Sequence, residues 1–269
     1  MPELPEVETI RRSLLPLRGA RLIGVEVASG QLRRPVAAAQ LAPAIGTRIE
    51  DFERRGKFLL AHLSEGLVLL FHFGMTGTVL VRDQGWCPRA HDHLWVNLDS
   101  GQVLVVNDPR RFGLVRLAPK GELEELRRLG PDAWSDAYDG AWLFAQSRAR
   151  KTAVKNWLMD QRVLAGLGNI YATEALHRAG IRPRRAAGRL RRSEAEALHR
   201  AIRVTLAEAI EAGGSSISDF RDARGRPGYF QHRFRVYERA GQPCFSCGAP
   251  IRRCILAGRS SFYCPACQH

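Results

Sequence analysis

Four cysteines near the C-terminus have the spacing of a metal site. They form two C-x-x-C pairs, Cys244/Cys247 and Cys264/Cys267, with 16 residues between the pairs. Thiolates three residues apart on a tight turn bind one ion together, and two such turns supply the four tetrahedral ligands of a structural zinc. Two disulfides are the alternative, but nothing else in the chain suggests secretion. Because four sulfurs close the site, we expect one zinc ion that holds structure and takes no part in chemistry.

The start of the chain, Met1-Pro2-Glu3, is a second candidate for chemistry. Methionine before proline is normally removed, which would expose the secondary amine of Pro2. An α-amino group has a pKa near 7.7–8.0, against about 10.4 for lysine, so it is partly neutral and nucleophilic near pH 7. Attack on a sugar C1′ would give an iminium, and the adjacent Glu3 could move protons. A terminal proline is also common without any role, so these residues alone leave both interpretations open.

The charge balance favours a polyanionic partner. The 269 residues include 41 Lys and Arg against 27 Asp and Glu, a formal net charge of +14. Residues 131–269 carry 23 basic and 12 acidic side chains, whereas residues 1–130 carry 18 and 15. Nucleic acid is the commonest partner of so basic a chain, and a solvated basic face is the alternative.

The lengths of the apolar runs and the composition of the N-terminus indicate where in the cell the protein is expected. No apolar run approaches the roughly 18 residues of a membrane helix, so no membrane partner is expected. The acidic N-terminus lacks the basic and apolar regions of a secretory signal, which favours the cytoplasm.

These residues need a scaffold, and the first half of the chain predicts one built from strands. A helix is expected over 7–17. Short apolar or alternating runs follow at 22–27, 57–63, 67–73, 78–81, 94–98 and 103–106. Such regularly interrupted strands are typical of an antiparallel sandwich or barrel.

The second half has helical spacing instead. Helices are expected over 153–158, 170–178 and 193–211. Ser193 with Glu196 predicts a capping box at the start of the last of these. The two C-x-x-C pairs lie at the C-terminal end of the chain, after these helices. The second half is therefore predicted to consist of helices followed by a small zinc-binding module.

Several short motifs, taken together, resemble one family. In order along essentially the whole chain they are MPELPEVE at 1–8, GKFLL at 56–60, HFGMTG at 72–77, NDPRRFG at 107–113, LGNIY at 167–171, GYF at 228–230 and the four-cysteine finger. This combination resembles bacterial formamidopyrimidine-DNA glycosylase. The sister family of the endonuclease VIII type shares the architecture but typically has glycine where Leu4 stands here, which favours the oxidised-purine branch.

The resemblance implies an enzyme of base-excision repair. Such an enzyme removes 8-oxoguanine and formamidopyrimidines from duplex DNA and then cleaves the abasic site by β,δ-elimination. Carried over by position, Pro2 is the nucleophile and Glu3 the general acid/base, while Lys57 donates a proton during β-elimination and Arg259 assists δ-elimination. Lys57 is one of only four lysines beside 37 arginines, and an ammonium exchanges protons where a guanidinium does not.

The resemblance also implies how a base leaves the duplex. Chemistry on a base requires that it flip out of the stack. Met75 and Phe112 would wedge into the gap, and Arg110 would contact the orphaned cytosine. Without the resemblance, Met75 and Phe112 would be expected in a core.

Phosphates are expected to be held from both halves of the chain. Asn169 follows Gly168 at a predicted helix start, and Arg259 lies at the tip of the finger. The residues His91, Arg150 and Lys151 match further DNA contacts of the family.

Some positions stay open. The loop 215–228 corresponds to the family's lesion-reading loop, but Ser218 replaces its usual arginine, which leaves the preferred lesion undecided. Glu6 matches the family's first turn and is given a supporting role, since an acid there is stabilising anyway. Cys87 and Cys254 have no ligand spacing and no assigned role.

The expectation is therefore an α+β monomer of several domains. An N-terminal antiparallel β-sandwich with a leading helix (1–130) is joined by a linker (131–149) to a helix-two-turns-helix DNA-binding bundle (150–228). A C-terminal β-hairpin zinc finger (229–269) follows, and DNA is expected in the cleft between the two parts. Two other functions remain: an oxidised-pyrimidine glycosylase of the endonuclease VIII type, and a non-catalytic zinc-finger protein that binds damage.

Overall fold

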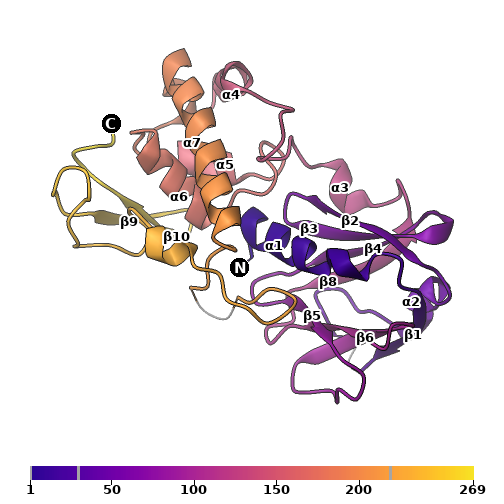
Figure 1. Ribbon diagram of the computed structural model, residues 1–269. Coiled ribbons are helices and arrows are strands. Elements are labelled where there is room, and N and C mark those ends of the chain that lie inside the picture. Colours follow the sequence, from indigo (N-terminus) through magenta and orange to yellow (C-terminus); the bar gives the residue numbers. More distant parts are fainter. Residues whose placement is uncertain (1, 29–30, 218–219) are drawn as a thin grey trace. The chain divides into compact units, whose positions relative to one another are not determined.

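The computed structural model describes residues 2–28, 31–217 and 220–269. The chain divides into two compact units, and each takes residues from two stretches (Figure 1). The first unit contains residues 1–127 and 212–229, and the second contains residues 128–211 and 230–269. In the described part of the chain, no helix has the length and apolar character needed to cross a membrane.

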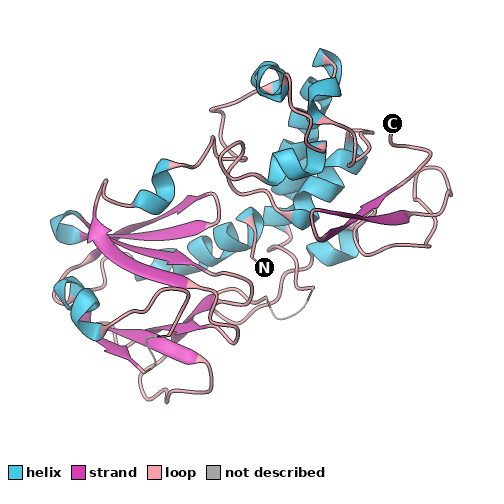
Figure 2. Cartoon of the chain, turned by 180° about the vertical axis from the view of Figure 1, so that it is seen from behind, coloured by secondary structure: helices cyan, strands magenta, loops and turns pink. Residues whose placement is uncertain are grey.

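The first unit is built on two four-stranded antiparallel sheets (Figure 2). One sheet has the order β1-β6-β7-β5 and the other β2-β3-β4-β8. The strands are β1 (Leu22–Val27), β2 (Ile49–Arg55), β3 (Phe58–Leu63), β4 (Leu67–His72), β5 (Thr78–Arg82), β6 (Asp92–Leu98), β7 (Val103–Asn107) and β8 (Leu114–Pro119). The predicted antiparallel sandwich is confirmed.

A leading helix, α1 (Leu4–Leu14), packs against β2, β3 and β5. Its residues Val7, Ile10 and Leu14 recur at helical spacing and are at most 1% exposed, in one core with residues from both sheets. Complete burial of such a side chain contributes about 1.5–3 kcal/mol. The packing of this face of α1 therefore fixes where the start of the chain lies against the sheets of this unit.

The helix begins three residues earlier than its apolar pattern predicts. Pro5 is accommodated in the first turn, where a missing N–H costs nothing. Two short helices, α2 (Ala38–Leu41) and α3 (Glu124–Arg127), also belong to this unit.

The second unit combines helices with a two-stranded hairpin. The helices are α4 (Gly140–Ser147), α5 (Val154–Met159), α6 (Asn169–Arg178) and α7 (Arg192–Glu211). Both α4 and α6 pack against α7. Strands β9 (Arg252–Leu256) and β10 (Arg259–Tyr263) pair antiparallel and form the finger hairpin. The predicted helical module and zinc-finger hairpin are confirmed.

The compact units divide the chain differently from the predicted ranges. Residues 131–149 contain α4, which Asp139 caps by accepting the Trp142 N–H at 2.7 Å, and are more than a linker. Residues 212–229 belong with the sandwich, where Val81 donates to the Ala223 carbonyl at 2.8 Å. Residues 230–269 form one unit with the helices.

The predicted capping box at Ser193 is wrong. Helix α7 begins at Arg192, so Ser193 lies inside its first turn. Glu194 Oε2 instead accepts the N–H of Arg191 at 2.7 Å. In a capping box, the glutamate three residues after the N-cap accepts the N–H of the N-cap residue. Here that glutamate is Glu194, so the N-cap is Arg191, two residues before Ser193.

Candidate functional site

The carboxylate of Glu6 anchors the start of the chain. Its Oε2 accepts the Glu3 N–H at 2.8 Å, and its Oε1 accepts both the N–H and the hydroxyl of Ser215, at 2.8 and 3.1 Å. Pro2, Glu3 and Glu6 are all buried. Gly214 has φ +78°, and a Cβ there would lie 2.9 Å from Oε1, so this close approach needs glycine. Glu6 therefore fixes Pro2 and Glu3 relative to the 212–229 segment.

Ser216 makes two further polar contacts within the described part of that segment. Ser216 Oγ donates to the Phe220 carbonyl at 2.7 Å and accepts the Gly228 N–H at 2.9 Å. Ser218, where the sequence departs from the family's usual arginine, lies outside the described residues.

Lys57 lies in the turn between β2 and β3 and is 7% exposed. Arg54 ties this turn to α1, because it donates to the Gly56 carbonyl and to Glu8 Oε2, both at 3.2 Å. Burial favours the neutral form of Glu8. Hydrogen bonds from Arg11 and Arg12 and the charges of Arg11 and Arg54 outweigh burial, so the pKa of Glu8 is lowered. The buried Arg54–Glu8 ion pair thus helps to set the position of the Lys57 turn.

His72, at the end of β4, was missed by the sequence reasoning although it opens the HFGMTG motif. Its ring packs on Phe58, with 4.9 Å between centroids. Burial, followed by the charges of Lys57 and Arg33, lowers the pKa of His72 to about 4. Its Nδ1 accepts the Gly74 N–H at 3.1 Å, so the neutral ring carries its proton on Nε2. A neutral imidazole adds no second positive charge to the surroundings of Lys57.

A buried carboxylate, Asp108, joins the two loops that carry the expected wedge residues. Its Oδ1 accepts the Thr76 hydroxyl at 2.8 Å, and its Oδ2 accepts the Gly113 N–H at 2.7 Å. Asp108 has no exposed surface. The loops also touch directly, since a Cβ on Gly74 would lie 2.4 Å from the Phe112 carbonyl carbon. Sequence reasoning missed Asp108, whose only signal was its place in NDPRRFG.

The expected wedge residues project from these joined loops. Met75 and Phe112 are 42% and 45% exposed, unusual values for large apolar side chains. The Arg110 guanidinium lies 5.0 Å from the centroid of the Phe112 ring. His91, also exposed, accepts the Asp108 N–H with its carbonyl at 3.0 Å. The structure therefore brings Met75, Arg110 and Phe112 to one pair of joined loops in the first unit, and the backbone of Asp108 links the neighbouring β5–β6 loop with His91 to them.

The second unit has a groove of about 510 Å³ at the start of α6. It is lined by Asn169, Tyr237, Glu238, Ala240, Arg253, Arg259, Ser260 and Phe262. Asn169 Nδ2 donates to the Tyr237 hydroxyl at 3.2 Å, and its buried Oδ1 has no hydrogen-bond partner among the residues described.

The other two expected DNA contacts lie elsewhere in the second unit. Arg150 and Lys151 are exposed in the connection between α4 and α5, and neither lines the groove. Gly188 approaches this connection closely, and its N–H donates to the Arg150 carbonyl at 2.9 Å.

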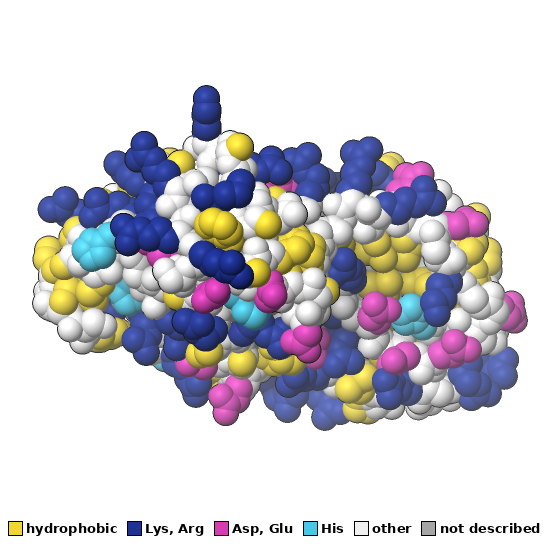
Figure 3. Space-filling model, turned by 90° about the horizontal axis from the view of Figure 1, so that it is seen from above, with side chains coloured by type: hydrophobic (Ala, Val, Ile, Leu, Met, Phe, Trp, Pro, Cys, Tyr) yellow, Lys and Arg dark blue, Asp and Glu magenta, His cyan; other side chains and the backbone are white. Residues whose placement is uncertain are grey.

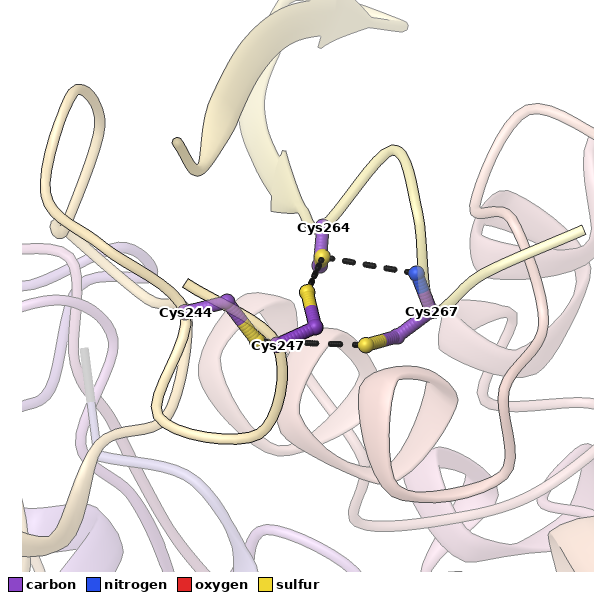
Figure 4. Close-up of side chains that lie close together, drawn as sticks. All are labelled: Cys244, Cys247, Cys264 and Cys267. Carbon is purple, nitrogen blue, oxygen red and sulfur yellow. Dashed lines mark hydrogen bonds between the residues drawn. The ribbon is translucent and has the colours of Figure 1, made fainter. Parts of the chain in front are cut away.

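The four finger cysteines converge on one point (Figure 4). All four Sγ atoms lie within 4.8 Å of one another, with Cys244 to Cys267 at 3.9 Å and Cys247 to Cys264 at 3.4 Å. Tetrahedral bonds of about 2.3 Å from zinc would place the sulfurs about 3.8 Å apart, so the cluster fits the ion. Within the described ranges, no other cluster of three or more Cys, His, Asp and Glu is arranged to hold a metal.

Electrostatics also favours a cation at this cluster. Hydrogen bonding to Cys247 and burial raise the pKa of Cys267 to about 12, because crowded thiols resist ionisation. A dication reverses this preference and holds all four as thiolates. The finger carries one structural zinc ion, and Cys87 and Cys254 stand apart from its ligands.

Buried polar side chains fasten the finger to the helices. Gln268 accepts the Cys264 N–H and donates to the Ile181 carbonyl, both at 2.8 Å. Lys155, on α5, is fully buried and donates to the Ser260 carbonyl at 2.9 Å and to Ser261 Oγ at 2.6 Å. Sequence reasoning missed both, because their partners are distant in the chain.

Comparison with known proteins gives matches along the whole chain. Residues 1–115 match the formamidopyrimidine-DNA glycosylase N-terminal domain, residues 129–221 match its H2TH domain, and residues 241–269 match a zinc finger found in FPG and IleRS. Formamidopyrimidine-DNA glycosylases of Syntrophotalea carbinolica and Alcanivorax borkumensis are 49% and 48% identical, and the matches cover 100% of both chains in each case.

Solved structures agree with these relatives. The MutM (FPG) protein of Thermus thermophilus is 42% identical, with a TM-score of 0.88 over 99% of this chain and 98% of that one. A Lactococcus lactis FPG mutant in complex with DNA containing Fapy-dG is 32% identical, with a TM-score of 0.92 over 100% of each chain. The chain therefore belongs to the formamidopyrimidine-DNA glycosylase family.

Proposed function

We propose that this chain is a bifunctional DNA glycosylase and abasic-site lyase that removes oxidised purines, namely 8-oxoguanine and formamidopyrimidines, from duplex DNA. The observation that carries the proposal is the anchored N-terminus: Glu6 holds Pro2 and Glu3 beside the 212–229 segment. Similarity over the full length of the family's members supports it.

The first chemical step is base release. Once Met1 is removed, the Pro2 nitrogen attacks C1′ of the damaged nucleotide and the glycosidic bond breaks. Glu3 moves the protons, so the base leaves protonated and the nitrogen becomes an iminium after the sugar ring opens. A buried carboxylate suits this task because its surroundings exclude bulk water.

Strand cleavage follows from the same intermediate. Loss of a C2′ proton expels the 3′ phosphate, and a second elimination expels the 5′ phosphate. Lys57 supplies a proton during the first elimination, and Arg259 assists the second. The position of Lys57 in a turn tied down by Arg54, near a neutral His72, supports its role as a donor.

DNA contacts use the remaining site residues. The loops joined by Asp108 carry Met75, Arg110 and Phe112, which fill the gap left by the flipped base. Asn169 and Arg259 bind phosphate in the second unit's groove, and the further contacts are His91, Arg150 and Lys151. Basic side chains spread over much of the face drawn in Figure 3 support a polyanionic partner.

The zinc finger supplies shape and no chemistry. When bound, zinc holds the four thiolates and so sets the hairpin that carries Arg259. We further propose that the chain acts as a monomer in the bacterial cytoplasm, where its DNA substrate lies and thiol ligands stay reduced.

Borohydride reduction during the reaction tests the proposal. Duplexes with 8-oxoguanine, formamidopyrimidine or thymine glycol are incubated with protein and borohydride, and covalent complexes are separated by electrophoresis. We expect trapping, fastest with the two purine lesions, and none after Pro2→Gly or after a residue is added before Pro2. Damage binding without trapping would identify a non-catalytic protein, and preference for thymine glycol would identify the endonuclease VIII type.

A further inference from the structure

One histidine of the second unit lies against a zinc ligand. His177 is in the last turn of α6, and its Nε2 lies 3.8 Å from Cys244 Sγ. Hydrogen bonds to sulfur are longer than the roughly 2.7–3.2 Å of oxygen acceptors, because the sulfur atom is larger. His177 is only 7% exposed, so water has little access to its ring. The proposed reaction gives this residue no role.

The backbone around the end of α6 holds the His177 ring beside the finger. The His177 carbonyl accepts the Gly180 N–H at 3.0 Å, and the Gly180 carbonyl accepts the His269 N–H at 3.0 Å. These bonds join the C-terminal end of α6 to the residues that follow Cys267. The approach of the ring to Cys244 is therefore supported by main-chain contacts on both sides.

The surroundings of the ring favour a proton on Nε2. The other ring nitrogen, Nδ1, is buried and has no hydrogen-bond partner among the described residues. A proton there would be a buried donor without an acceptor, and it would turn the Nε2 lone pair toward the sulfur. A proton on Nε2 points at Cys244 Sγ instead, and zinc would hold that sulfur as a thiolate. Hydrogen bonds to a charged acceptor are stronger than those to a neutral one.

The chemistry of the finger gives such a donor a use. Four thiolates around one dication leave an excess of negative charge in a partly buried cluster. Hydrogen-bond donors to the ligand atoms spread this charge and orient the ligands. The backbone N–H groups of Ser246 and Cys247 already donate to Cys244 Sγ. His177 offers the same sulfur a donor from a different element, helix α6.

We propose that His177 donates a hydrogen bond from Nε2 to the zinc-bound sulfur of Cys244 and thereby strengthens zinc binding by the finger. His177 acts through Cys244 and is a positioning residue. The inference goes beyond the proposed function, because it depends neither on the nucleophile nor on the lesion. Loss of a group that hydrogen-bonds to a metal ligand weakens metal binding about 10- to 100-fold. We expect the lower end of that range, because the contact is long.

Two replacements of His177 separate hydrogen bonding from packing. His177→Phe keeps a planar ring without an N–H, whereas His177→Gln loses the ring and keeps an N–H donor of similar reach. Zinc affinity of the full chain is measured by competition with a chromophoric chelator under reducing conditions. We expect His177→Phe to bind zinc about tenfold more weakly than wild type, with His177→Gln between the two. If the ring only fills space, His177→Gln is instead the weaker variant.

His199→Phe is the matched control, because it makes the same replacement on another helix of this unit. His199 lies on α7, and its ring packs edge-on against Tyr138 with 5.0 Å between centroids. This variant should bind zinc with wild-type affinity.

Cobalt in place of zinc reports on the sulfur atoms directly. Loss of an N–H donor raises the energy of the sulfur lone pairs, so the sulfur-to-cobalt charge-transfer band of His177→Phe should move to longer wavelength. The bands of His177→Gln and His199→Phe should stay close to that of wild type. A change in packing alone leaves the band in place.

Thermal unfolding of the metal-loaded chains shows that each variant is folded, and His177→Met repeats both measurements if phenylalanine is not accommodated. Wild-type zinc affinity or an unshifted cobalt band in the apolar variant would overturn the inference. Weaker zinc binding by His177→Gln than by His177→Phe would overturn it as well. Borohydride trapping plays no part in these measurements, so failure of the proposed reaction would leave the result for His177 standing.

Discussion

Replacing Asp108 by alanine should uncouple base extrusion from the later chemistry. The carboxylate is fully buried, and its loss leaves the Thr76 hydroxyl and the Gly113 N–H without the acceptor that now lies 2.8 and 2.7 Å away. Each such group costs about 1–3 kcal/mol, so we expect a loss of about 2–6 kcal/mol in the free energy of unfolding. The loops of Met75 and Phe112 should then move independently.

Single-turnover kinetics on two substrates separates the affected step. An intact 8-oxoguanine duplex requires a base to be extruded, whereas a preformed abasic site has none. We expect Asp108→Ala to slow excision by at least about tenfold and to slow cleavage of the abasic site much less. Asp108→Asn should recover part of the rate, because its oxygen still accepts the Gly113 N–H while the Thr76 hydroxyl turns to accept from the amide.

A variant destabilised elsewhere in the unit is the control. Leu41 is 2% exposed in the core, and Leu41→Ala should cost about 2–5 kcal/mol without touching either loop. It should excise 8-oxoguanine at the wild-type rate at a temperature where it is folded. If Leu41→Ala and Asp108→Ala lose both activities to the same extent, the claim that Asp108 acts through the loops is wrong.

Three further predictions follow from the contacts. Because the pKa of His72 falls from 6.5 to about 4 on folding, acidification from pH 6.5 to 4 should progressively remove up to about 3 kcal/mol of stability; urea unfolding of His72→Gln should lack this loss. Glu6→Gln leaves one of its two buried amide partners without an acceptor, so Schiff-base trapping should fall about tenfold or more, while exposed Glu50→Gln should trap normally. Metal analysis should find about one zinc per chain in wild type and Cys254→Ser, but much less in Cys247→Ser.

Sequence predicts best where one local signal decides the outcome. Strands with continuous apolar runs, such as 67–73, were recognised, whereas β2 (IEDFERR) was missed because only Ile49 and Phe52 in it are buried. The sequence pattern also predicts no strand at β8, and it predicts a linker over the residues that form α4. The cysteine spacing was enough to predict the metal cluster that the fold assembles.

The supports of the site depend on contacts that no local pattern contains. Lys155 and Ser261 are 106 residues apart, and Glu6 and Ser215 are 209 apart. Order in the chain predicts that residues 212–228 belong to the helical domain, although their hydrogen bonds join this segment to the sandwich. Motifs predict candidate site residues, whereas the groups that hold those residues in place are seen only when the chain is folded.

The identity of the nucleophile is tested most directly by mapping the borohydride-reduced complex. Mass spectrometry of the digested complex locates the sugar adduct, and the intact chain shows which residue comes first. We predict a mature chain that starts at Pro2 and an adduct on the peptide containing Pro2. An adduct on Lys57 or another lysine, or full strand cleavage by chains that retain Met1, would contradict the account.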